Sequence, residues 1–343
     1  SLSGNSDDKC YVYFDVGVES IADYCDTGTD LATCVKNFGD QGSAISNIYI
    51  HNSSLANGAG DNSYRYAGAS DKVNNFVCFG STAATCPTDN LYRIVGVFGE
   101  NNHGVTGKQL VKLIKYDYAS SNLLGTNGDY AGSGTPNANY YKGSLSSIAG
   151  YYWNYNNNTT INNGNGSNEW STSLQNKINL NTNYLNNIGT TWSNLVEDTT
   201  WKVSGHSTSE VTPTEMYTRE IKNAIKTYGP SDGTSKIGLM YASDYGFAAG
   251  PSAWTTPLYN YDGYDANGTS ITTINWMYMG YDEWTISPSS SNSYYVFCLS
   301  IDGYLYSYFA NYGYGFRPVL YLKSSALYAG GSGTKNSPIT LVV

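Results

Sequence analysis

Charged side chains are scarce in this sequence. They make up 13% of the 343 residues, about half of the usual share in soluble proteins. The 18 basic residues are outnumbered by 27 acidic ones, so the formal net charge is −9. An acidic surface repels nucleic-acid phosphates and anionic lipid headgroups. We therefore expect neither nucleic acid nor an anionic membrane surface among the partners.

Metal-binding motifs and catalytic histidine motifs are also missing. The chain has three histidines, which lie far from the cysteines, and no Cys-X-X-Cys pair. Zinc sites and nucleophilic triads both need such residues at defined spacings. We therefore expect no structural metal and no triad. No motif pairs two carboxylates in the way that a glycosidase requires.

The six cysteines favour disulfides instead. Cys78 and Cys86 enclose a short turn-rich loop, and Cys25 and Cys34 have a similar spacing. Disulfides form in oxidising compartments, so this pairing predicts an extracellular or cell-surface location. The alternative is a cytosolic protein in which all six cysteines are buried thiols.

Long apolar runs are absent as well. A membrane-spanning helix needs roughly 20 consecutive apolar residues. The longest apolar stretches here, such as 91–98, have the length of a strand. We expect no membrane insertion by this segment. No signal peptide is visible, and we expect the chain to begin after any targeting segment.

Uncharged polar and aromatic residues dominate what is present, with 34 tyrosines and 37 glycines. We expect an irregular, disulfide-bearing segment over 1–70 and a ligand-binding domain over 71–343. The apolar patterns predict strands, helices and long ordered loops, and hence an α+β fold. The expected strands are 76–79, 92–98, 111–116 and 236–241, with the second and third as a hairpin; the expected helices are 174–188 and 214–227, and the loops fill 125–168.

The segment 289–312 has an unusual composition, mostly Ser, Tyr, Asn and Gly. Antibody combining sites have a similar one, because Tyr gives rigid contact area and the small residues give adaptable hydrogen bonds. The pair Asp302-Gly303 predicts a two-residue hairpin turn. Tyr304, Tyr306 and Tyr308 would then share one face, beside Ile301, Leu299 and Phe297. The same face could instead be a half-buried packing surface.

Two aromatic blocks enclose this segment, Glu283-Trp284-Thr285 and Gly315-Phe316-Arg317. They resemble the end of a C-type-lectin-like domain of the formylglycine-generating-enzyme type, as used by the variable proteins of diversity-generating retroelements. In that family the mutated residues lie between such blocks, and adenine mutagenesis turns Asn codons into codons for Tyr, Ser and Asp. The resemblance implies a variable region at about 276–317 held by a scaffold of Trp276, Trp284, Phe316 and Arg317.

Most of residues 55–343 are also similar to a group of bacterial surface proteins, some with pilin-like N-termini. The resemblance to formylglycine-generating enzymes does not extend to their catalysis, since they need paired active-site cysteines and only Cys298 lies in this half. The segments that carry the similarity to the surface proteins are 57–66, 76–80, 90–98, 237–241, 244–249 and 317–322.

We expect a ligand-binding adhesin or receptor-like protein and no enzyme. Its partner would be a protein or glycan on another cell, a phage or a host surface. One alternative is a structural pilin-like subunit that uses the same face for pilus or surface assembly, and another is a carbohydrate-active enzyme. The expected ligand-binding residues are Tyr281, Asp282, Asn292, Tyr294, Tyr295, Ile301, Asp302, Tyr304, Tyr306, Tyr308, Asn311 and Tyr312.

No cofactor is expected. Asp262, Asp265 and Asn267 offer oxygen atoms on a loop before Gly268, and calcium there is an alternative, although the spacing misses the EF-hand pattern. A solvated turn is the other reading of this loop.

Overall fold

The computed structural model describes residues 19–99, 103, 107–126, 141–145, 148–155, 164–224 and 233–343. Helices and β-sheets both contribute, which confirms the α+β class. Most of the segment 125–168, where long ordered loops were expected, lies outside the described residues. No helix among the described residues is long and apolar enough to cross a membrane.

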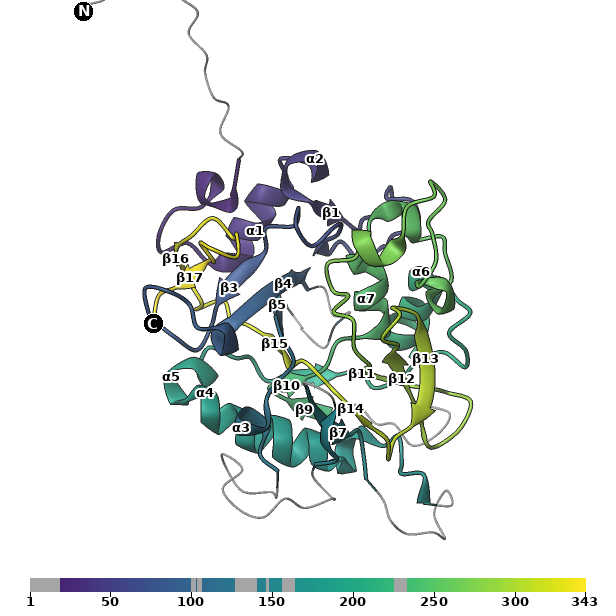
Figure 1. Ribbon diagram of the computed structural model, residues 1–343. Helices are drawn as coiled ribbons and strands as arrows, with labels where there is room; N and C mark the ends of the chain where they lie inside the picture. The colour runs from purple at the N-terminus through teal and green to yellow at the C-terminus, as the bar shows by residue number, and fades with distance from the viewer. Residues whose placement is uncertain are drawn as a thin grey trace, which may run out of the picture.

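An antiparallel sheet of seven described strands forms the centre of the molecule (Figure 1). Its two longest strands, β4 and β5, form the expected hairpin and are buried along their whole length. This explains why their sequences run apolar instead of alternating, since both faces are covered. The strands in order are β1 (Ile48–Ile50), β2 (Tyr64–Tyr66), β4 (Leu91–Phe98), β5 (Leu110–Lys115), β15 (Val319–Tyr321) and β10 (Ile237–Gly238), with β3 (Phe76–Cys78) paired to β4.

The first 70 residues are not the irregular appendage that we expected. β1 and β2 lie in this stretch, and β2 pairs directly with β4, so the central sheet crosses the boundary expected at residue 70. Helix α1 (Leu31–Gly39) begins at Asp30, whose carboxylate accepts hydrogen bonds from the backbone N–H groups of Ala32 and Thr33. The sequence did not predict β1 and β2 because each has only three residues, which are too few to show the apolar pattern of a strand.

Both expected disulfides are present. Cys25 is bonded to Cys34 with a Cα–Cα distance of 5.0 Å, and Cys78 is bonded to Cys86 with a distance of 5.7 Å. The first ties α1 to the turn before it, and the second closes the loop between β3 and β4. Cys298 is a buried free thiol.

The two expected helices form, the first over almost the whole expected range and the second over a shorter one. The first spans Gln175–Tyr184 with π-type hydrogen bonds and continues as α4 (Leu185–Ile188). The second is α6 (Pro213–Tyr217), continued by a π-type turn over Thr218–Lys222; the expected end, 225–227, lies outside the described residues. The strand expected over 236–241 is only β10, because the chain then turns into α7 (Ala242–Ala248).

The other helices are one turn long. They are α2 (Ser43–Ser46), α3 (Ser121–Leu124), α5 (Thr190–Ser193) and the 3₁₀ turns Ile21–Tyr24, Thr88–Asn90, Trp170–Thr172, Pro251–Ala253, Leu258–Asn260 and Ile271–Ile274.

A second antiparallel sheet carries the tyrosine-rich segment. Figure 1 places it on the opposite side of the molecule from the C-terminal strands β16 and β17. Its strands are β11 (Glu283–Pro288), β12 (Tyr295–Leu299) and β13 (Leu305–Phe309). The smaller sheets are β14 (Gly313–Tyr314) with β7 (Ile148–Tyr152) and β6 (Gly143–Leu145), β8 (Thr199–Trp201) with β9 (Gly233–Ser235), and β16 (Tyr328–Gly330) with β17 (Thr340–Leu341).

Close approach of β2 to β4 makes Gly96 a sensitive position. A Cβ atom there would lie 2.1 Å from the backbone oxygen of Tyr64. We expect Gly96→Ala to lower the free energy of unfolding by about 2–4 kcal/mol, because two paired strands must move apart. Gly250→Ala is the matched control, since its Cβ would meet the Ile274 side chain at an ordinary 3.5 Å. Equal losses for the two variants in denaturant unfolding would contradict this packing.

Candidate ligand-binding surface

The β12–β13 hairpin differs from the expected two-residue turn. The connecting loop spans residues 300–304, with the Ser300 N–H donating to the Tyr304 carbonyl and the Gly303 N–H donating to the Ser300 carbonyl. Tyr306 consequently lies opposite Cys298, and Tyr308 lies opposite Val296. The expected partners, Leu299 and Phe297, were wrong by one residue because the loop is longer than two residues.

Tyr304, at the end of the loop, and the tyrosines of β13 nevertheless share one face, and the row continues into β14. Ring centroids are 5.6 Å apart for Tyr304 and Tyr306 and 6.1 Å apart for Tyr306 and Tyr308. Tyr308 packs on Tyr312 at 4.8 Å, and Tyr312 packs on Tyr314 at 5.3 Å. We call these five residues the tyrosine ladder. All except Tyr314 are partly exposed, and Tyr312 is 46% exposed.

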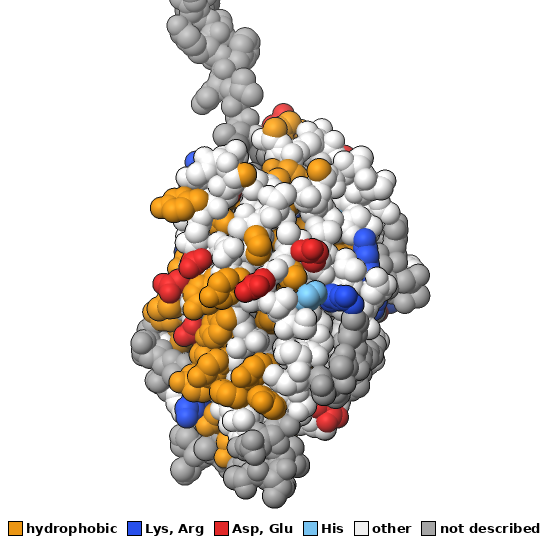
Figure 2. Space-filling model, turned by 90° about the vertical axis from the view of Figure 1, so that its right-hand side faces the viewer, with side chains coloured by type: hydrophobic (Ala, Val, Ile, Leu, Met, Phe, Trp, Pro, Cys, Tyr) orange, Lys and Arg blue, Asp and Glu red, His pale blue; other side chains and the backbone are white. Residues whose placement is uncertain are grey.

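A hollow of about 270 Å³ lies beside the ladder. Four expected site residues come together in its wall, namely Tyr281, Asp282, Ile301 and Tyr312. Ile301 is 52% exposed. Figure 2, which looks at the side of the molecule where β13 lies in Figure 1, shows a broad hydrophobic patch with acidic side chains next to it. The rest of the wall is formed by Ile148, Gly313 and Tyr314.

Asp282 connects the hollow to the ladder. Its Oδ1 atom accepts hydrogen bonds from the Ile301 backbone N–H at 3.2 Å and from the Tyr306 hydroxyl at 3.3 Å. Tyr306 also contacts the Tyr314 hydroxyl at 2.8 Å. Burial raises the pKa of Asp282 above its usual value, and the two donors act against this shift.

The remaining expected site residues lie elsewhere on this sheet. The Asn292 side chain accepts hydrogen bonds from the backbone N–H groups of Tyr294 and Tyr295, which shapes the turn between β11 and β12. Asn311 donates to the Gly164 carbonyl. Asp302 is exposed in the β12–β13 loop. The structure therefore brings the hollow and ladder residues together, whereas Asn292, Tyr294 and Tyr295 lie at the other end of the hairpin.

The four expected scaffold residues are buried and hold the ends of the tyrosine-rich segment. The indole N–H of Trp276 donates to the Tyr66 carbonyl, and that of Trp284 donates to the Tyr151 carbonyl. The Phe316 ring packs on Tyr151 at 5.3 Å. Arg317 forms a bidentate ion pair with the Glu283 carboxylate, with Nε–Oε1 and Nη2–Oε2 distances of 2.8 and 2.9 Å, and donates a hydrogen bond to the Met277 carbonyl.

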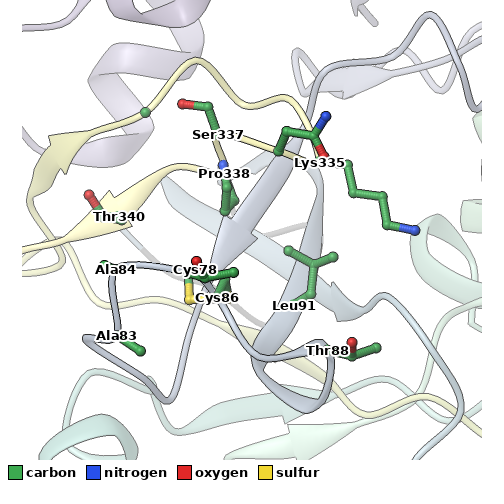
Figure 3. Close-up of a pocket in the computed structure, with 13 residues that line it drawn as sticks. Cys78, Ala83, Ala84, Cys86, Thr88, Leu91, Lys335, Ser337, Pro338 and Thr340 are labelled. Atoms are coloured by element: carbon green, nitrogen blue, oxygen red, sulfur yellow. A yellow bond between two sulfur atoms is a disulfide. The ribbon is translucent and has the colours of Figure 1, made fainter.

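A larger hollow of about 470 Å³ lies in another part of the surface, between the Cys78–Cys86 loop and the segment before β17 (Figure 3). Small side chains such as Ala83, Ala84 and Thr88 line much of it. Lys335, Asn336 and Ser337 add polar groups, but the described lining includes no aromatic ring and no carboxylate, so size alone does not make this hollow the better candidate.

The loop considered for calcium forms a turn. The Asp265 carboxylate accepts hydrogen bonds from the backbone N–H groups of Asn267 and Thr269. In the described part of the chain, no group of three or more His, Cys, Asp and Glu side chains is arranged to hold a metal ion.

Sequence reasoning missed a buried network of charges, which we call the polar core: Asp61, Arg65, His103, Lys112 and Asp244. Arg65 contacts Asp61 at 2.8 Å, and His103 contacts the same carboxylate at 3.2 Å. Lys112 is in direct contact with Asp244. All five side chains are at most 2% exposed. The one available signal was the lysine inside the apolar run 110–114, since an unpaired buried cation is rare.

The protonation states of the polar-core side chains depend on their burial and on the charged groups that they contact. Burial favours the neutral form of Asp61, but Arg65, His103 and Ser63 together outweigh burial and lower the pKa of Asp61. Burial lowers the pKa of His103 to about 4, so this ring is neutral at pH 7. Glu220 lies next to the polar core and accepts hydrogen bonds from the first backbone N–H groups of α7, at Ala242 and Ser243.

Comparison with known proteins adds no relative. No family model, no curated protein and no solved structure matches the chain.

Removing one partner of the buried pair Glu283–Arg317 should be costly. Arg317→Met leaves a buried carboxylate without its cation, and we expect a loss of about 3–5 kcal/mol in the free energy of unfolding. The double variant Glu283→Gln/Arg317→Met should recover part of this loss. Lys108→Met is the control, because Lys108 pairs with Glu197 at a position 51% exposed and should cost at most about 1 kcal/mol. Equal losses for Lys108→Met and Arg317→Met would refute a structural role for the buried pair.

Burial raises the pKa of Glu220 from 4.5 to about 7, which makes stability depend on pH. The folded chain holds this proton more tightly than the unfolded chain, so the contribution is complete below pH 4.5 and is lost as pH rises through 7. We expect the unfolding free energy of the wild type, relative to that of Glu220→Gln, to fall by about 2–3 kcal/mol from about pH 5 to about pH 8. Taking the difference removes the contributions of the histidines. A difference that stays constant over this range would mean that Glu220 is ionised throughout.

Proposed function

We propose that this chain is an extracellular bacterial surface protein that binds a protein or glycan ligand through the tyrosine ladder and the adjoining hollow. The observation that carries the proposal is the continuity of ladder and hollow. Tyr312 belongs to both, and Asp282 joins them through its contact with Tyr306. Aromatic contact area and a carboxylate are thereby presented on one accessible surface.

The chemistry of the ladder suits recognition without catalysis. Tyrosine rings bury large areas against a ligand at a low entropic cost, and their hydroxyl groups form hydrogen bonds at the same time. Both hydrogen bonds described for Asp282 end on Oδ1. We infer that Oδ2 accepts a hydrogen bond from a hydroxyl or amine of the ligand.

A C-type-lectin-like fold with a retroelement-diversified region is part of this proposal. Its support is the separation between anchoring and surface positions in segment 276–317. Trp276, Trp284, Phe316 and Arg317 are each 0–1% exposed, whereas the expected contact residues are exposed or half-buried. Substitution of a side chain on such a surface costs little stability, while the anchors keep the backbone fixed. The two disulfides are compatible with an oxidising compartment outside the cell.

The exposed apolar side chains also favour a second candidate, a pilin-like structural subunit. Tyr312, Ile301 and Tyr259 are between 46% and 52% exposed, and Tyr259 packs against Tyr304 of the ladder. A neighbouring copy of the chain could cover these side chains in an assembly. Self-association of the purified protein distinguishes this function from binding of an external ligand.

Substitution of the ladder tests the proposal. We expect Tyr304→Ser/Tyr308→Ser/Tyr312→Ser to lose at least about tenfold in affinity for ligands found on glycan arrays and bacterial surface-protein panels, since aromatic anchors dominate such interfaces. Melting temperature should change little because these rings are partly exposed.

Tyr116→Ser is the matched control, because Tyr116 lies by Lys335, next to the hollow of Figure 3. It should bind as wild type does. Unchanged binding by the triple variant would refute the ladder as the binding surface. A wild-type oligomer that the triple variant converts to monomers would instead support the structural subunit.

A further inference from the structure

Lys112 and Asp244 are far apart in the sequence, but their side chains are in contact in the interior of the molecule. Lys112 lies on β5 in the central sheet, and Asp244 lies in the first turn of α7. The Lys112 Nζ atom is in direct contact with Asp244 Oδ2, and both side chains are 0% exposed. The contact is separate from the tyrosine ladder and does not depend on the proposed function.

Aromatic rings surround the Lys112 ammonium group. Their centroids lie 4.5 Å away for Tyr241, 5.3 Å for Phe98, 5.5 Å for Tyr321 and 5.9 Å for Trp201. Aromatic rings attract a cation through cation–π interactions, but this attraction does not make up for the hydration that the ammonium group loses on burial. Burial lowers the pKa of Lys112, which favours the nucleophilic neutral amine. A proton that moves from Nζ to Oδ2 along their contact converts the ion pair to an amine and a carboxylic acid.

Arg65 is placed to assist at the other carboxylate oxygen. Its Nη1 atom lies 3.7 Å from Asp244 Oδ1, and neither of these two buried atoms has a hydrogen-bond partner among the described residues. A donor in this place stabilises negative charge that develops on Oδ1 when a nucleophile adds to the carboxyl carbon. Asp61 neutralises Arg65 through its own contact at 2.8 Å. The charges of Arg65 and Asp61 therefore stay balanced after those of Lys112 and Asp244 are removed.

We propose that Lys112 and Asp244 condense into an intramolecular isopeptide bond. Nζ attacks the Asp244 Cγ atom, the Cγ–Oδ2 bond breaks, and Oδ2 leaves as water with two protons that come from the Lys112 ammonium group. Nζ keeps one hydrogen, and Oδ1 becomes the amide oxygen that faces Arg65. The reaction needs no oxidant and no other reactant. The product links β5 to α7 across 132 positions of the sequence.

Intact mass spectrometry of the full chain, folded and then reduced and denatured, tests the bond. The expected result is a mass one water molecule below that of the sequence, with a protease fragment that joins the peptides containing Lys112 and Asp244. Lys112→Arg should have the full mass. Lys115→Arg, which changes another buried lysine of β5, should keep the deficit.

A wild-type protein of full mass, after prolonged incubation at neutral pH, would overturn the proposal. So would a deficit that persists in Lys112→Arg, because that result indicates dehydration elsewhere, for example at Asp302-Gly303. If Lys112→Arg fails to fold, the presence or absence of the joined fragment in the wild type decides the question by itself.

Discussion

Glu283 and Arg317 form a buried ion pair that fixes both ends of the tyrosine-rich segment at one place. Glu283 begins β11, and Arg317 lies two residues before β15 of the central sheet. Backbone hydrogen bonds reinforce the junction, since the Trp284 N–H donates to the Gly315 carbonyl and the Gly315 N–H donates to that of Asp282. The segment between these ends is thus closed at its base. Its strands β11 and β12 are largely buried, whereas the β12–β13 loop and most of the ladder tyrosines are partly exposed.

A second set of buried charges holds the central sheet to its helix. The polar core joins β2 through Arg65 and β5 through Lys112 to the start of α7 through Asp244. Buried charges require partners, because leaving one unpaired costs more than a surface ion pair contributes. In a chain with so few charged residues, the concentration of several in one buried site specifies how these elements pack. The same packing brings the side chains of Lys112 and Asp244 into direct contact.

The sequence predicted best those features that depend on neighbouring residues. The β4–β5 hairpin, the two disulfides and the starts of both predicted helices follow from local apolar runs and cysteine spacing. β1 and β2 escaped prediction because each is three residues long and is defined by pairing with strands distant in sequence. The turn at Asp302-Gly303 was placed correctly but its length was not, and this moved the partners of Tyr306 and Tyr308 by one residue. Only Lys112, inside an apolar run, indicated the polar core, since its five members come together only in the folded chain.

We propose that the surface around the ladder and hollow binds the ligand and that the buried anchors support it. Sequencing this gene across many sister isolates tests that division most directly. We predict substitutions concentrated at the exposed positions of 281–312, with Trp276, Glu283, Trp284, Phe316 and Arg317 unchanged and a template repeat with a reverse transcriptase nearby. Substitutions spread evenly over the chain, or a ladder that never varies and has no template, would contradict a diversified binding surface.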